Sequence, residues 1–373
     1  MAGAAESAKQ TAASAAERAN RTLGRTMPGL QLSVHAAAEW GDDAAALAHC
    51  HEDIARADIV IATMLFMEEH FLPVLPALKA RRDHCDAMVC AMSAAEVMKL
   101  TRMGKFSMDA PASGPMALLK RLRGKSGNDT ASNDAEAGSK ATAGAKQMKM
   151  LRRLPKILRF IPGTAQDVRA YFLTLQYWLA GSQDNVASMV QFLVDRYADG
   201  ARKPLRGIAP VQPPLEYPEV GVYHPRMPQR LSTQLADLPL VATTGKRGTV
   251  GVLLMRSYLL AGNTSHYDGV ITALEARGMK VLPAYATGLD NRPAIDAYFM
   301  KDGRPTIDAL VSLTGFSLVG GPAYNDAKSA EDTLAKLDVP YLAVTPVEFQ
   351  TLDQWGASER GLLPVDRKST RLN

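Results

Sequence analysis

One buried strand and the residues that follow it constrain the fold of this chain more than any other segment. The run Val250–Met255 is continuously apolar, which is typical of a strand covered on both faces. A loop of small residues, Ala261–Ser265, follows it, and a helix is predicted to begin at Ser265. A buried strand followed by a helix is the repeating unit of a parallel sheet, and ligands bind such sheets outside the carboxyl ends of the strands. The segment therefore predicts an α/β fold and the place of a site.

Five polar side chains are predicted to gather at that edge. They are Arg256, Asn263, His266, Tyr267 and Asp268. We interpret them as a substrate-binding or docking group, because they follow the strand directly. The structural alternative is that Ser265 or Asn263 caps the helix, with Asp268 favourable in its first turn. We assign no catalytic residue and no metal ligand to this group.

The C-terminal third repeats the same alternation of strand and helix. The predicted strands are Thr249–Met255, Lys280–Tyr285, Ala309–Leu313 and Tyr341–Val344. The predicted helices are Ser265–Arg277, Pro293–Met300, Asp326–Leu337 and Val347–Trp355. Four repeats predict a doubly wound, flavodoxin-like or Rossmann-like parallel sheet over residues 241–366. The glycine-rich stretch Thr314–Pro322 is expected at its ligand edge, since glycine permits close approach of the backbone.

Residues 1–123 carry a second alternation of this kind. Its predicted strands are Leu30–Val34, Asp58–Met67 and Cys85–Met92, and its predicted helices are Ala12–Leu23, Ala44–Ala57, Glu69–Arg82 and Ala94–Met103. We expect a second doubly wound parallel-sheet unit here. Two prolines, Pro73 and Pro76, weaken the third helix in its first turns.

The two units are expected to be joined by three further parts. Residues 124–145 are rich in Ser, Asn, Asp, Gly and Ala and predict a flexible linker. Residues 146–240 predict a helical hairpin and then a connector. The hairpin helices are separated at Gly181 and end at Gly200, and Thr164–Asp167 resembles a capping box at their start. The connector, 203–239, is rich in proline and is expected to run extended across the surface, because proline blocks a helix and a central strand alike.

Charge and composition exclude several classes of protein. Eleven Lys and Arg face three acidic residues between Lys120 and Arg159, a net charge of +8 in a chain whose total is +5. This basic segment suits an acidic partner or anionic lipid, or is simply a solvated face, and no nucleic-acid motif accompanies it. Three cysteines argue against a disulfide framework. No secretory leader or run of about eighteen apolar residues is present, so a cytoplasmic location is expected.

Clustered histidines and cysteines raise the question of a metal site. They are His49, Cys50, His51, His84, Cys85 and Cys90. The first three are consecutive, so on a helix they point about 100° apart. Cys85 and Cys90, if both lie on one strand, face opposite sides. We therefore predict no metal site.

Six stretches, in order along the chain, together resemble one family. They are Asp58–His70, Ala95–Phe106, Tyr171–Asn185, Tyr217–Arg226, Arg256–Ile271 and Leu313–Pro322. The chain is similar, from about Ala12 to Val365, to the large porphyrin-binding subunit of magnesium chelatase, a family that includes the cobaltochelatase large subunit. The first two stretches favour the magnesium enzyme.

The resemblance implies a function and a set of partners. In the family, Mg²⁺ and protoporphyrin IX are substrates of the full enzyme of chlorophyll and bacteriochlorophyll synthesis. ATP is used by two AAA+-type partner subunits, which agrees with the lack of a Walker A motif here. A downstream methyltransferase and a peripheral position at the photosynthetic membrane are also implied. No cofactor is expected on this chain itself.

The resemblance also implies that the chain is an N-terminal fragment, inactive alone, with metal insertion beyond Val365. Residues 367–373 match nothing in the family and are interpreted as a non-native tail. Two alternatives remain: a cobaltochelatase large subunit of cobalamin synthesis, and a non-catalytic flavodoxin-like module that binds a tetrapyrrole.

Overall fold

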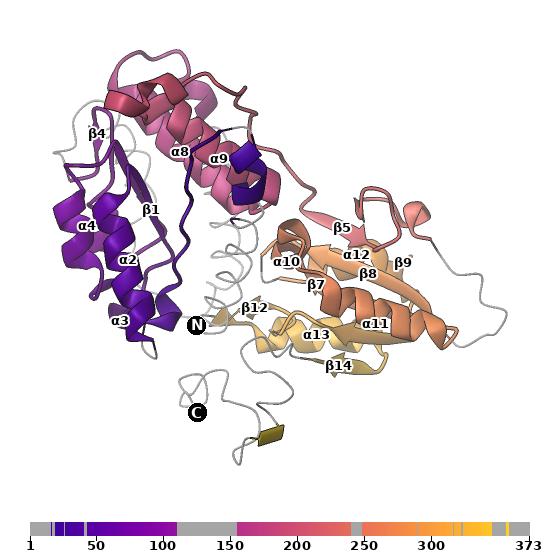
Figure 1. Cartoon of the computed structure of the whole chain (residues 1–373). Helices are drawn as coiled ribbons and strands as arrows, with labels where there is room; N and C mark the ends of the chain where they lie inside the picture. The colour runs from indigo at the N-terminus through magenta and orange to yellow at the C-terminus, as the bar shows by residue number, and fades with distance from the viewer. Residues whose placement is uncertain are drawn as a thin grey trace, which may run out of the picture. The chain divides into compact units, whose positions relative to one another are not determined.

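The computed structural model describes two compact units (Figure 1). The described residues of the N-terminal unit lie within Ala15–Leu215, and those of the C-terminal unit lie within Glu216–Asn373. The described residues are 16, 19–25, 27–40, 43–109, 155–239, 248–288, 290–315, 317–321, 324–344 and 356–357. Three predicted segments lie outside the described residues: the linker 124–145, the helix Val347–Trp355 and the tail 367–373.

The N-terminal unit is built on a four-stranded mixed sheet. Its strands are β1 (Ile59–Thr63), β2 (Ala87–Ala91), β3 (Arg102–Met103) and β4 (Phe106–Ser107), in the order β1-β2-β3-β4. The β1–β2 pair is parallel, whereas the β2–β3 and β3–β4 pairs are antiparallel. The sequence predicted a parallel sheet because it assigned residues of β3 to a helix.

The predicted strand Leu30–Val34 is wrong. These residues belong to no strand, and Leu30 and Leu32 instead pack beside a cluster formed with helix α9. Leu30 and Leu32 are half-buried whereas Val34 is 46 % exposed, so the alternation is only partly buried and has no strand partner.

Helices enclose this sheet. They are η1 (Ala37–Glu39), α2 (Ala44–Arg56), α3 (Glu68–Phe71), α4 (Leu75–Arg81), α5 (Ala95–Met98), α8 (Thr164–Ala180), α9 (Gln183–Tyr197) and η2 (Gly200–Leu205). The α2 helix begins where predicted, because the Asp43 carboxylate accepts hydrogen bonds from two backbone N–H groups of its first turn. The predicted helix Glu69–Arg82 is divided at Pro73 into α3 and α4.

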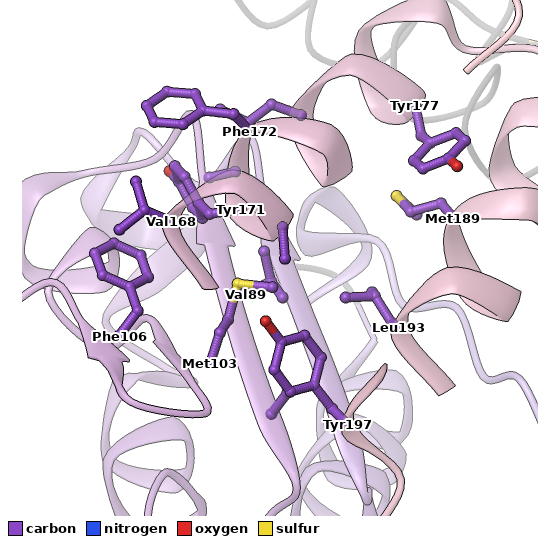
Figure 2. Close-up of a cluster of buried hydrophobic side chains, with 14 of the residues drawn as sticks. Val89, Met103, Phe106, Val168, Tyr171, Phe172, Tyr177, Met189, Leu193 and Tyr197 are labelled. Carbon is purple, nitrogen blue, oxygen red and sulfur yellow. The ribbon is translucent and has the colours of Figure 1, made fainter. Parts of the chain in front are cut away.

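Alternating residues of the central strand divide the core of the N-terminal unit into two layers. Met88 and Cys90 pack with α2, α3 and α4. Ala87, Val89 and Ala91 point to the other face and pack with α8 and α9. Figure 2 shows the second layer, where Tyr171 of α8 and Tyr197 of α9 lie near Val89. The predicted helical hairpin is thus confirmed as the cover of one sheet face, separated at Gly181, whose φ of 64° suits glycine.

The C-terminal unit is built on a six-stranded mixed sheet in the order β14-β11-β7-β8-β5-β6. Its strands are β5 (Val220–Tyr223), β6 (Leu231–Ser232), β7 (Thr249–Met255), β8 (Lys280–Ala286), β11 (Ala309–Ser312) and β14 (Tyr341–Ala343). The four strands predicted from the sequence are found and are mutually parallel. Two short antiparallel pairs, β9 (Met300–Lys301) with β10 (Arg304–Pro305) and β12 (Gly320–Gly321) with β13 (Tyr324–Asn325), lie outside this sheet.

Strand β5 corrects the prediction of an extended proline-rich connector. It pairs antiparallel with β8 on one side and β6 on the other, so it is an internal strand. Pro218 and Pro225 flank it and none lies within it, so its backbone donors remain available to the sheet. The helices of this unit are η3 (Leu235–Asp237), α10 (Arg256–Ala261), α11 (Ser265–Ala276), α12 (Arg292–Tyr298) and α13 (Ala327–Leu337).

Candidate functional site

The predicted site lies at the carboxyl end of β7, as the sequence indicated, but its local structure differs. A short helix, α10, for which no helix was predicted, lies between β7 and the predicted loop, and Gly262 ends this helix with a φ of 71°. Helix α11 then begins at Ser265. The sequence did not reveal α10 because its six residues are too few to show helical periodicity.

Arg256 ties this edge to the connector before β5. Its guanidinium donates hydrogen bonds to the backbone carbonyls of Pro218 at 2.9 Å and Tyr217 at 3.0 Å. A planar guanidinium can hold two adjacent carbonyls at once, which a lysine ammonium does less well. Arg256 therefore positions the entry to an internal strand.

Tyr267 supports the end of β7 from inside the unit. Its side chain is fully buried, and its hydroxyl oxygen accepts a hydrogen bond from the Met255 N–H at 3.1 Å. Burial raises the pKa of the Tyr267 hydroxyl, so the phenol is neutral. This residue braces the strand end.

Asp268 accepts hydrogen bonds from the Tyr223 hydroxyl at 2.5 Å and the Thr264 hydroxyl at 3.1 Å. The N-cap of α11 is Thr264, and it makes no side-chain capping bond, so the alternative in which Ser265 or Asn263 caps the helix is wrong. Asn263 is half-buried, and its backbone N–H donates to the Tyr258 carbonyl at 3.0 Å.

His266 is held between aromatic rings. Its ring lies 3.9 Å from the Tyr267 ring and 5.4 Å, edge to face, from the Tyr258 ring, measured between centroids. Its Nε2 atom is buried and has no hydrogen-bond partner among the described residues. Burial lowers the pKa of His266, against a smaller opposing effect of Asp268, so the imidazole is neutral at about pH 7.

The structure therefore places all five predicted residues at the carboxyl end of β7, but their side chains differ in burial and in hydrogen-bond partners. Arg256, Tyr267 and Asp268 bond to the unit's own backbone and side chains. Asn263 and His266 are half-buried. An open hollow of about 400 Å³ lies at the carboxyl ends of β11 and β14, lined in part by Ser312, Gly315 and Ser317. The predicted glycine-rich edge thus borders a hollow, within the residues described.

The predicted absence of a metal cluster rested on partly wrong geometry. Cys85 precedes β2 and packs in the same cluster as Cys90 and Cys50, so the two are not on opposite strand faces. Burial raises the pKa of Cys50 to about 11 and that of Cys90 to about 12, so these thiols are protonated. Among the described residues, no three His, Cys, Asp or Glu side chains converge as metal ligands.

A polar network around Asp167 was not foreseen from the sequence. Its carboxylate accepts hydrogen bonds from the Lys105 N–H at 3.0 Å, the Tyr197 hydroxyl at 3.0 Å and the Arg196 guanidinium at 3.1 Å. The capping-box prediction was wrong, because Gly163 is the N-cap of α8 and makes no side-chain bond. These groups border an open hollow of about 600 Å³ near the amino end of β2.

The C-terminal unit contains a buried pair of polar side chains, His224 and Glu275. His224 is 2 % exposed, and its Nε2 lies 3.1 Å from a carboxylate oxygen of Glu275. Its Nδ1 accepts a hydrogen bond from the Arg226 N–H at 3.2 Å, so the neutral ring donates to Glu275 through Nε2. Burial lowers the pKa of His224 despite the opposing effect of Glu275.

This pair gives a pH-dependent stability. Because the folded pKa of His224 lies below its unfolded value of about 6.5, protonation favours the unfolded chain, and stability falls as the pH drops through that value. We expect the urea midpoint of unfolding to be lower at about pH 5.5 than at about pH 7.5. The fall in this midpoint should be smaller in His224→Gln, whose amide still offers a donor to Glu275 but does not titrate. An equal fall in both proteins would contradict this assignment.

No helix in the described parts of the chain has the length and apolar character that a bilayer crossing requires. The fold and edge together define an α/β protein whose candidate site follows a parallel strand. Residues 8–172 match the model of a domain of unknown function, DUF3479, and residues 175–370 match that of CobN/Magnesium Chelatase. The chain belongs to the CobN/magnesium chelatase family.

Individual relatives agree with the family match. The chain is 54 % identical to the H subunit of the magnesium chelatase of Cereibacter sphaeroides, over 95 % of the chain and 28 % of that protein. It is 33 % identical to the chloroplastic magnesium-chelatase subunit ChlH of Oryza sativa subsp. indica, over 96 % of the chain and 26 % of that protein. The catalytic subunit of cobaltochelatase from Mycobacterium tuberculosis is similar with a TM-score of 0.47 and 18 % identity, over 95 % of the chain and 22 % of that structure. The chain spans little more than a quarter of these curated relatives.

Proposed function

We propose that this chain is part of the porphyrin-binding subunit of a magnesium chelatase. The observation that carries the proposal is the 54 % identity, over 95 % of the chain, to the magnesium-chelatase subunit of Cereibacter sphaeroides. The whole protein would take Mg²⁺ and protoporphyrin IX as substrates in chlorophyll or bacteriochlorophyll synthesis. The high identity to magnesium-chelatase subunits favours this function over cobaltochelatase.

The chemistry of the reaction sets what the whole subunit must provide. Mg²⁺ prefers oxygen ligands and sheds water reluctantly, whereas the porphyrin offers four nitrogens and must lose two protons. Carboxylates or a histidine near the ring are the groups that guide the ion and accept protons. We assign no such role to the described residues, and we place metal insertion in the part of the subunit that this chain does not span.

The proposed partners follow from the same function. Two AAA+-type subunits would hydrolyse ATP, and a downstream methyltransferase would take the product. We place the protein in the cytoplasm, peripheral to the photosynthetic membrane. We keep the division into 1–123, 124–145, 146–240 and 241–366 as a proposal, and propose that the parallel part of the C-terminal sheet is doubly wound.

For the group at the end of β7, the proposal is a docking or substrate-binding surface. Arg256, Tyr267 and Asp268 would hold its shape through their internal bonds. Asn263 and His266, which are half-buried, would supply the contacts. A neutral imidazole can donate or accept a hydrogen bond without the cost of burying a charge.

Reconstitution tests the function. We expect the chain alone, mixed with both AAA+ subunits, ATP, Mg²⁺ and protoporphyrin IX, to form no Mg-protoporphyrin. We expect activity when this chain replaces the matched region of the Cereibacter sphaeroides protein, because the two are 54 % identical over that region. Product from the chain alone would overturn the placement of metal insertion elsewhere. A folded chimera that binds porphyrin without inserting metal would favour the non-catalytic module.

A further inference from the structure

A short helical stretch, residues 155–158, and the turn after it expose large apolar side chains beside cations, just before α8. Ile157, Phe160 and Ile161 are 58 %, 83 % and 39 % exposed, and Phe160 is the most exposed large apolar side chain among the described residues. Lys156 and Arg159, also exposed, alternate with them. We refer to these five residues as the 156–161 patch.

Hydrogen bonds from α8 and burial of Leu158 hold the backbone of this segment in place. Leu158 is 3 % exposed and packs into the core beside α8. The Gln166 side chain donates to the carbonyls of Leu158 at 2.8 Å and Arg159 at 3.2 Å, and Arg169 donates to the Pro155 carbonyl at 3.0 Å. The exposed apolar side chains therefore project from a backbone that α8 fixes.

The surroundings of the patch are positively charged. Burial lowers the pKa of the Arg169 guanidinium, and the cations Arg159 and Arg196 lower it further. The nearby carboxylate of Asp167 is already bonded to Arg196 and Tyr197. Lys156 and Arg159 are exposed cations within the patch, so it attracts anions.

We propose that the 156–161 patch binds an anionic lipid surface. Ile157, Phe160 and Ile161 would enter the boundary between headgroups and acyl chains, with Lys156 and Arg159 beside lipid phosphates. Apolar side chains interleaved with cations over so short a stretch fit this boundary, where both kinds of group are satisfied. An acidic soluble partner would need the cations but not an exposed phenylalanine. The inference deepens the proposed peripheral location and does not depend on metal insertion.

Sedimentation of the full chain with vesicles tests the proposal. We expect binding to phosphatidylcholine vesicles that contain phosphatidylglycerol, little binding to pure phosphatidylcholine, and weakening by salt. The pair Ile157→Ser with Phe160→Ser, and separately the pair Lys156→Glu with Arg159→Glu, should each weaken partitioning at least about tenfold. Leu72→Ser is the matched control: Leu72 is 52 % exposed in the same unit but adjoins no such cations in sequence, and it should bind as the unaltered chain does.

Two results would overturn the proposal. One is absence of binding to the phosphatidylglycerol vesicles by the unaltered chain. The other is unchanged binding of the Ile157→Ser, Phe160→Ser pair, which would indicate a purely electrostatic contact such as an acidic protein makes. Circular dichroism verifies that the variants fold, which we expect because the substituted side chains are exposed. Loss of lipid binding alone leaves the chelatase assignment intact, because the measurement involves no metal insertion.

Discussion

Gly221→Ala is expected to destabilise the C-terminal unit by about 3 kcal/mol, the upper end of the cost of overpacking a core. A Cβ at position 221 of β5 would lie 2.7 Å from the Ser232 carbonyl oxygen and closer still to the Tyr285 hydroxyl oxygen. Both neighbours belong to strands paired with β5, so neither can withdraw without disturbing the sheet. Urea unfolding followed by circular dichroism measures the loss, and hydrogen exchange of β5 and β8 locates it.

Two further variants make this prediction specific. Gly269→Ala is the matched control, since a Cβ at this exposed position of α11 meets no atom within 4 Å, and it should leave stability equal or raise it slightly. The Tyr285 hydroxyl is buried without a partner among the described residues, so Tyr285→Phe should cost little. In that background Gly221→Ala should cost less, with a coupling of at least about 0.5 kcal/mol. Equal effects of the Gly221 and Gly269 variants would refute the packing of β5.

Asp167→Ala is expected to destabilise the N-terminal unit by about 3 kcal/mol, because the partly buried Arg196 loses its carboxylate and the buried Tyr197 hydroxyl loses its acceptor. The Asp167 side chain is 13 % exposed and accepts bonds from α9 and from the β3–β4 turn. Fluorescence of Trp178, which lies on α8 beside the same core, reports the unfolding.

The control for this variant is an exposed ion pair. Asp332 pairs with Lys328 on α13, where the two side chains are 55 % and 79 % exposed, so Asp332→Asn should leave the free energy of unfolding almost unchanged. Gly104→Ala provides independent support. Its φ is 57°, and its Cβ would lie 2.7 Å from the Asp167 carboxylate, so it too should destabilise. A change for Asp167→Ala no larger than that for Asp332→Asn would contradict the network.

The parts of the fold with strong periodicity could be predicted from the sequence. The bounds of β7 were predicted to the residue, and α8 and α9 were recognised from their apolar faces and the glycine between them. The predicted strand Leu30–Val34 was wrong because an apolar alternation does not by itself supply a strand partner: Leu30 and Leu32 pack beside a helical cluster, and Val34 is exposed. Strand β5 was missed because four residues between prolines give too short a pattern.

At the candidate site, too, the sequence predicted the positions of residues along the chain but not the partners of their side chains. The sequence placed His266 correctly at the start of α11 after a parallel strand, since that follows from order along the chain. The partners of its side chains could not be predicted, because Tyr223 and Tyr217 reach this edge from a segment separated from it by some forty residues. Asp167 was likewise predicted to cap its own helix, whereas its hydrogen-bond partners lie on other elements.

Metal insertion by the chimera tests the account most directly. The Cereibacter sphaeroides protein carrying this chain in its matched region would be incubated with both AAA+ subunits, ATP, protoporphyrin IX and either Mg²⁺ or Co²⁺. We expect ATP-dependent formation of Mg-protoporphyrin and no cobalt product above that of the unaltered protein. A folded chimera that binds both AAA+ subunits but forms no Mg-protoporphyrin would contradict it.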